Sequence, residues 1–159
     1  LDEVVRNGSN REARQAMLLG ACLAGQAFAN APVAAVHALA YPLGGHFHIP
    51  HGLSNALVLP HVLGFNGNAA APLYAELAPL VLGDQLRAGS VLQQTEQFIG
   101  ALADFSVRSG LPTRLRDAGV PQDMLPTLAR DAMQQQRLLV NNPREMTEAH
   151  ALAIYQVAY

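Results

Sequence analysis

Four of the six histidines in this chain lie within one short stretch, residues 37–51. They are His37, His46, His48 and His51. Imidazole binds divalent transition metals and exchanges protons near neutral pH. The stretch is therefore the first candidate for a site that does chemistry.

The spacing of His37 and His51 favours a metal site. His51 follows His37 by 14 positions, and a helix–loop reversal of that length can bring both side chains to one point. Two neutral imidazoles with two further donors make a tetrahedral or open metal site. The chain offers no His-x-x-x-His or His-x-x-x-Glu pair to complete such a set, so the spacing alone predicts only part of a site.

The remaining candidates near this stretch are less constrained. Tyr41 lies one helical turn after His37, on the same face of the expected helix. This position fits either an aromatic packing residue or a polar wall of the pocket. His46 is expected to face solvent, and His48 could face the pocket or solvent. We expect His61 to be structural, and the pattern around His150 gives that residue no role.

Composition narrows the class of protein. Half of the 159 residues are hydrophobic and 14% are charged, which favours a globular domain with a substantial core. A formal net charge of −2 gives no reason to expect nucleic acid or an anionic membrane as partner.

All basic residues are arginine, which excludes a lysine nucleophile. The one cysteine, Cys22, excludes an intrachain disulfide and is expected to be buried. No signal peptide or membrane span is visible, so we expect a cytoplasmic protein.

The elements that must position these residues are all helical. A Ser9–Glu12 capping box should open a helix of about 20 residues. Pro42 should end the next helix, leaving a loop from Leu43 to Pro50 in which Gly44 and Gly45 permit unusual backbone angles. The further expected elements are helices over 51–62, 71–82, 90–109, 121–136 and 147–157, a turn over 64–68, a glycine-closed helical turn over 111–119, and a loop over 141–144. No strand-like alternation is present, which predicts a single all-α domain.

The histidine stretch also resembles a family signature. The pattern is His37-x3-Tyr-Pro-Leu-Gly-Gly-x5-His51-Gly-Leu-Ser-Asn-Ala-Leu-Val-Leu-Pro-His-Val, and it resembles the second signature of the iron-containing (group III) alcohol dehydrogenases. The segments Gly25–Asn30, Gly110–Val120 and Asn141–Arg144 resemble flanking parts of the same family. The resemblance covers essentially the whole chain.

The resemblance implies a fold and a ligand set. It implies a helical bundle like the C-terminal domain of these enzymes, a dehydroquinate synthase-like helical domain. In that family an Asp-x-x-x-His helix and two later histidines hold the metal, and His37 and His51 fall on the two later positions. Residues 1–159 would then be one helical metal-binding domain. They would be a fragment lacking the NAD(P)-binding domain and the first part of the helical domain, including the Asp-x-x-x-His pair upstream of Leu1.

One position departs from the family pattern. Many members carry a histidine where this chain has Tyr41, beside the nicotinamide. The resemblance therefore implies catalytic and cofactor-binding positions at Tyr41 and a cofactor contact at His48. A phenol is a poor base at neutral pH, so the proton route is open between His48, the ribose 2′-hydroxyl and water.

The implied function is NAD(P)-dependent interconversion of an alcohol and an aldehyde or ketone, with Fe(II) or alternatively Zn(II) as metal and either NAD or NADP as cofactor. By itself the fragment should be inactive. A small alcohol or carbonyl substrate is the expected partner, and self-association into a homo-oligomer is left open. Alternatives are a maleylacetate reductase-like or glycerol dehydrogenase-like enzyme, or a non-catalytic helical binding or dimerisation module.

Overall fold

The computed structural model describes residues 1–159, which form α-helices and short 3-10 turns with no strand. The predicted all-α fold is thus confirmed. Contacts between residues divide the chain into two compact units, Leu1–Val33 and Ala34–Tyr159.

The first unit holds α1 (Asp2–Arg6) and α2 (Arg11–Asn30). The predicted Ser9 capping box is wrong, because Asn10 is the N-cap residue of α2. Its side-chain oxygen accepts from the Ala13 amide at 3.1 Å, and its side-chain nitrogen donates to Glu3 Oε1 at 3.0 Å. An asparagine amide can accept and donate at once, so Asn10 caps α2 and ties it to α1.

The helices of the first unit have no buried residue. Cys22 is exposed, so the prediction that it is buried is wrong. Large apolar side chains of α2 are exposed as well, among them Leu18 and Phe28. A five-residue α1 cannot cover a 20-residue helix, which explains why the apolar composition around Cys22 did not predict its exposure.

The second unit begins with α3 (Ala35–Phe47), which continues through Pro42. The predicted stop at Pro42 and the predicted loop from Leu43 are therefore wrong. A proline inside a helix removes one hydrogen bond and destabilises it by about 3 kcal/mol. Here Pro42 and its neighbour Leu43 are buried, and this packing offsets the loss. Gly44 and Gly45 adopt ordinary helical angles, and the helix ends instead at His48, which has a left-handed φ of 55°.

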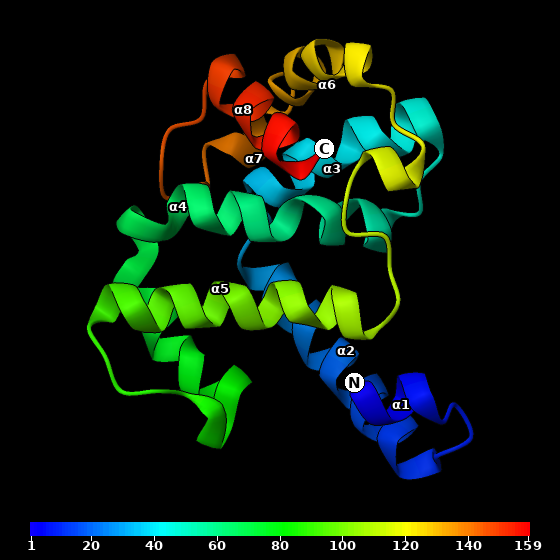
Figure 1. Ribbon diagram of the computed structural model, residues 1–159, viewed down its shortest axis with the longest axis vertical. Coiled ribbons are helices and arrows are strands. Elements are labelled where there is room, and N and C mark those ends of the chain that lie inside the picture. Colours follow the sequence, from blue (N-terminus) through cyan, green and yellow to red (C-terminus); the bar gives the residue numbers. More distant parts are fainter. The chain divides into compact units, whose positions relative to one another are not determined.

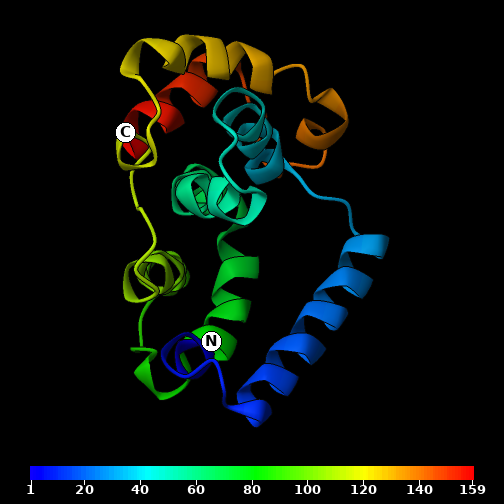
Figure 2. The same cartoon turned by 90° about the vertical axis from the view of Figure 1, so that its right-hand side faces the viewer.

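The next helix, α4 (His51–Leu82), contains 32 residues and three prolines, and it changes direction along its length (Figures 1 and 2). The predicted end near residue 62 and the predicted turn over 64–68 are wrong. Asn66 and Gly67 are buried within the helix rather than exposed in a turn. A Cβ on Gly67 would lie 3.9 Å from side-chain atoms of Thr95 and Ile99, an ordinary van der Waals distance, so this residue lies in the helix surface that packs against α5.

The helix α5 (Val91–Arg108) lies beside α4 (Figure 1), and Ser90 caps it with a capping box completed by Gln93. This start was predicted from the sequence. The remaining elements are η1 (Gly83–Gln85), η2 (Arg116–Ala118), η3 (Gln122–Met124), α6 (Leu125–Ala132), α7 (Gln136–Leu139) and α8 (Glu148–Ala158). Gly119 closes η2 with a φ of 84°, as the sequence predicted, whereas α6 is shorter than predicted and α7 was not predicted.

The core of the second unit lies where α3 and α4 meet α6 and α8 (Figure 2). Its fully buried large side chains include Leu39, Leu43, Leu57, Leu128 and Tyr155. The Tyr155 hydroxyl donates to the Leu39 carbonyl at 2.6 Å, and burial raises the pKa of that hydroxyl strongly. This packing fixes the position of α3 on α4, and with it the histidines that those helices carry.

No single helix combines the length and the apolar composition needed to cross a membrane. Only α2 and α3, when counted together across the break between them, have both the length and the apolar composition.

Candidate metal centre

His37 and His51 approach each other across the turn that joins α3 to α4. His37 lies in the first half of α3, and His51 is the first residue of α4. Their ring centroids are 5.1 Å apart and the ring planes are tilted by 53°. The two imidazoles therefore converge from different helices, although 13 residues separate them in the chain.

Tyr41 completes a cluster of three rings. Its ring centroid lies 6.3 Å from that of His37 and 6.2 Å from that of His51. The contact with His37 is edge-to-face, with an interplanar angle of 86°. Tyr41 thus stands beside both imidazoles, at a similar distance from each.

The surroundings of His37 favour its neutral form. Burial lowers the pKa of His37, and the nearby His51 ring lowers it further by charge repulsion. Neutral imidazole is the form that binds a metal. The site therefore keeps at least one of its two imidazoles ready to act as a ligand at neutral pH.

Asn55 makes an additional contact with His51 that the sequence did not reveal. Its side-chain nitrogen lies 3.1 Å from His51 Nε2 and 3.0 Å from the His51 carbonyl oxygen. The other end of the same amide, Oδ1, is buried without a hydrogen-bond partner. The i, i+4 spacing of His51 and Asn55 on α4 could have suggested the contact.

His46 and His48 lie outside the ring cluster. His48 is exposed at the C-cap of α3, and the ring contacts of the cluster do not include it. His46 is exposed, as expected, but it is also paired: its Nε2 lies 2.7 Å from Asp131 Oδ2 on α6. The structure thus separates the four clustered histidines into a facing pair, a link between helices and a helix end.

The last two histidines lie elsewhere in the second unit. His61 and His150 both line a cavity of about 360 Å³ that also includes Phe65 and Arg144. His150 Nδ1 accepts from the Thr147 amide at 3.2 Å and completes the capping box of α8. We expected no role for His150 from the sequence, although the Thr-x-x-His spacing resembles a capping box with histidine in place of glutamate.

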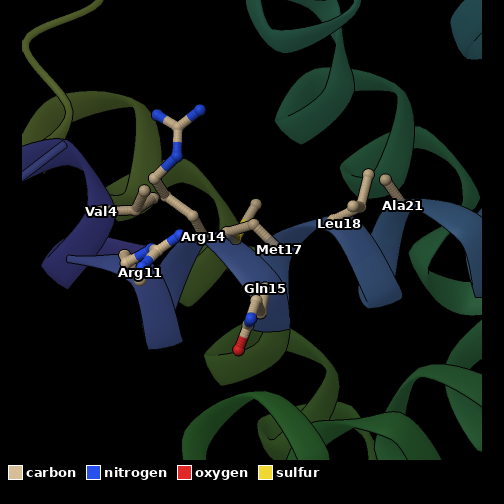
Figure 3. Close-up of a pocket in the computed structure, with 7 residues that line it drawn as sticks. All are labelled: Val4, Arg11, Arg14, Gln15, Met17, Leu18 and Ala21. Carbon is tan, nitrogen blue, oxygen red and sulfur yellow. The ribbon is translucent and has the colours of Figure 1, made fainter. Parts of the chain in front are cut away.

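A different cavity lies on the first unit. It has a volume of about 630 Å³, with Val4, Arg11 and Arg14 at one end and Leu18 and Ala21 at the other (Figure 3). None of the three clustered rings lines it. Its side chains offer apolar surface and two guanidinium groups but no acid, base or nucleophile, so it is not a candidate for the chemistry of the histidine cluster.

The donor set fits a divalent transition metal only in part. Imidazole nitrogen suits Fe(II) and Zn(II), and two histidines supply half of a four-ligand set. Within the chain no group of three or more His, Cys, Asp or Glu side chains could hold a metal ion. Any metal held by His37 and His51 must therefore take further ligands from outside these residues.

The fold is helical, and it brings two histidines together at the turn between α3 and α4. The family model described as Fe-containing alcohol dehydrogenase family, C-terminal, matches residues 1–159. The chain belongs to this family.

Proteins similar to the chain are alcohol and aldehyde oxidoreductases. It is 42% identical to long-chain-alcohol dehydrogenase 1 of Geobacillus thermodenitrificans, over all of the chain and 40% of that protein. It is 38% identical to 1,3-propanediol dehydrogenase of Klebsiella pneumoniae, over all of the chain and 41% of that protein. A crystal structure of 1,3-propanediol oxidoreductase superposes with a TM-score of 0.94 at 37% identity, covering 99% of the chain and 41% of that structure. The chain thus spans about 40% of the length of the relatives it matches.

Proposed function

We propose that this chain supplies two metal-binding histidines, His37 and His51, to an NAD(P)-dependent enzyme that interconverts alcohols with aldehydes or ketones. The observation that carries the proposal is the convergence of the two rings, 5.1 Å apart, from adjacent helices of a domain in this family. Iron is the expected metal, and zinc is the alternative.

The residues of this chain would hold and shield the reacting centre. His37 and His51 each offer a neutral imidazole nitrogen, and the packing of α3 on α4 fixes their separation. When bound, the metal supplies Lewis-acid polarisation of the alcohol or carbonyl oxygen, and the nicotinamide carries the hydride. Tyr41, against both rings, can donate a hydrogen bond toward substrate or cofactor.

The proton route is proposed to involve the exposed end of α3. Tyr41 would orient the reacting oxygen, and His48, held at the left-handed C-cap of α3, would contact the cofactor from the protein surface. The names of the relatives support an alcohol as substrate, with 1,3-propanediol and long-chain alcohols as the first compounds to try. A cytoplasmic location and self-association stay predictions.

The test uses the full-length protein that contains this chain. Metal content and NAD(P)-linked alcohol oxidation are measured for the wild type, His37→Ala and His51→Ala. Removing one of four ligands should reduce bound metal by at least tenfold and abolish most activity, because a bound metal depends on every ligand in its set. His46→Ala, which removes a nearby histidine outside the cluster, is the matched control and should retain both.

Two outcomes would contradict the proposal. Full metal loading and activity in His51→Ala would remove the ligand assignment. Metal binding without turnover of any alcohol or of maleylacetate would favour the non-catalytic helical module. Turnover of glycerol alone would favour the glycerol dehydrogenase-like enzyme, and turnover of maleylacetate alone would favour the maleylacetate reductase-like enzyme. The 159-residue chain by itself should bind metal weakly and show no turnover, because it offers two ligands.

A further inference from the structure

We propose that the cavity between α4 and α8 binds a small organic monocarboxylate, with the carboxylate beside Arg144 and His150 and the apolar tail against the cavity wall. This cavity, which we call the α4–α8 cavity, has a volume of about 360 Å³, and small-molecule sites are commonly of this size. Neither His37 nor His51 lines it. The inference therefore goes beyond the proposed function and does not depend on a metal.

The walls of the α4–α8 cavity suit a ligand with an apolar tail. α8 packs against α4 (Figure 1), and Phe65 of α4 and Ile154 and Val157 of α8 face the space between them. Arg144 and Val157 are exposed, so the cavity opens to solvent. No acidic side chain lines it. An apolar wall beside a cation, without a competing carboxylate, matches an anion that carries a hydrocarbon chain.

Arg144 supplies the positive charge of the α4–α8 cavity. Its guanidinium carbon lies 4.1 Å from the centre of the Phe65 ring, and its Nη1 donates to the Phe65 carbonyl at 3.0 Å. No ion pair of the structure includes Arg144. A guanidinium has further N–H donors and pairs well with a carboxylate. The charge is thus held in place by Phe65 and stays available to a ligand.

His150 supplies a second donor without adding charge. Its ring centroid lies 5.0 Å from that of Phe65, and its Nδ1 accepts from the Thr147 amide. An accepting nitrogen carries no proton, so the ring proton is on Nε2, which is left as a donor. Burial lowers the pKa of His61, the other imidazole at the cavity, and so favours its neutral form. One full positive charge remains, which matches a monoanion.

The first experiment tests the class of ligand. Isothermal titration calorimetry measures the affinity of the full-length protein for hexanoate, acetate and hexanamide at neutral pH. Hexanoate should bind roughly tenfold or more tightly than the other two, because acetate lacks the apolar tail and hexanamide lacks the charge. Acetate that binds as tightly as hexanoate would rule out the apolar wall, and hexanamide that binds as tightly would rule out the pairing with Arg144.

Two substitutions at His150 locate the site. In the capping box of α5, the Gln93 side chain accepts from the Ser90 amide, so a glutamine or a glutamate at position 150 can cap α8 in the same way. His150→Gln should keep hexanoate affinity within about threefold, since an amide still donates. His150→Glu should weaken it roughly tenfold or more, because it places a negative charge beside the ligand carboxylate. The two variants differ in charge and hardly in size, so a lost cap cannot explain the difference.

A carboxylate can also bind a metal, and His51→Ala separates the two sites. Hexanoate affinity should be unchanged in His51→Ala, even though that variant is expected to lose metal and activity. Hexanoate binding that is lost in His51→Ala and kept in His150→Glu would place the ligand at the histidine pair and overturn the proposal. Equal affinity in His150→Gln and His150→Glu, or no binding to the wild type, would also overturn it. None of these results bears on the proposed function, which metal content and turnover test.

Discussion

Single buried side chains connect the helices of the second unit. The Thr95 hydroxyl donates to the Ala71 carbonyl, joining α5 to α4, and the Tyr155 hydroxyl donates to the Leu39 carbonyl, joining α8 to α3. A buried polar group that loses its partner destabilises the fold more than an exposed one does. Such residues therefore support the histidine cluster from a distance.

Tyr155→Phe tests this support. The substitution removes the hydroxyl but keeps the ring, so the free energy of unfolding should fall by about 1.5 kcal/mol. Urea unfolding followed by circular dichroism measures the change. Tyr159→Phe removes a hydroxyl outside the core and should have little effect, and equal losses in the two variants would contradict the role of the Leu39 contact.

His61 should make the stability of the fold depend on pH. Burial lowers its pKa below the ordinary value of 6.5, so the unfolded chain binds more protons than the folded chain between that lowered pKa and 6.5. The free energy of unfolding should therefore decrease as pH falls through this window. In His61→Gln the decrease should be smaller, whereas above pH 7.5 the two curves should run parallel. Parallel curves throughout the acid range would show that His61 does not contribute.

At the scale of the element, helix starts are decided by one or two residues. Ser90 and Gln93 cap α5, Thr147 and His150 cap α8, and Asn10 caps α2. Each cap satisfies backbone amides that the first turn leaves unpaired. Removing a cap should therefore loosen one end of a helix without disturbing its middle.

Asn10→Ala and Ser9→Ala separate the observed cap from the predicted one. Loss of the Asn10 cap should destabilise the first turn of α2 by about 1 kcal/mol, seen as several-fold faster hydrogen exchange at residues 12–15. Ser9→Ala should leave that exchange nearly unchanged. The opposite pattern would restore Ser9 as the cap residue.

Turn and capping residues in the sequence predicted some helix ends correctly and others wrongly, because packing against other helices can override them. The start of α5 at Ser90 and the Gly119 stop depend on neighbouring residues alone, and both were predicted. Pro42 and the Gly64–Asn68 segment normally end helices, but burial against other helices keeps them helical here. The spacing of His37 and His51 suggested their approach, whereas the Asn55 contact depends on a side-chain orientation that spacing does not define.

At the scale of the whole molecule, residues distant in sequence are joined by paired amides. Asn66 on α4 and Asn142 exchange two hydrogen bonds of 2.8 Å across 76 positions. Arg144, in the same loop, donates to the Phe65 carbonyl and stacks over the Phe65 ring. These contacts hold the loop over 141–144 against the middle of α4.

A double-mutant cycle on Asn66 and Asn142 tests this link. Each single alanine variant should lose about 2 kcal/mol of unfolding free energy, because it removes two hydrogen bonds from the other amide. The double variant should lose less than the sum, by about 1 kcal/mol. Strictly additive losses, measured by urea unfolding, would show that the two amides act independently.

The exposed thiol of Cys22 has a practical consequence. It is the one cysteine of the chain, and it lies in the Leu1–Val33 unit, whereas His37 and His51 lie in the Ala34–Tyr159 unit. A nitroxide attached there labels a single position without altering any core residue. If Co(II) or Mn(II) binds the proposed histidine pair, electron spin resonance would measure the distance between the label and the metal, and so the separation of the two units in solution.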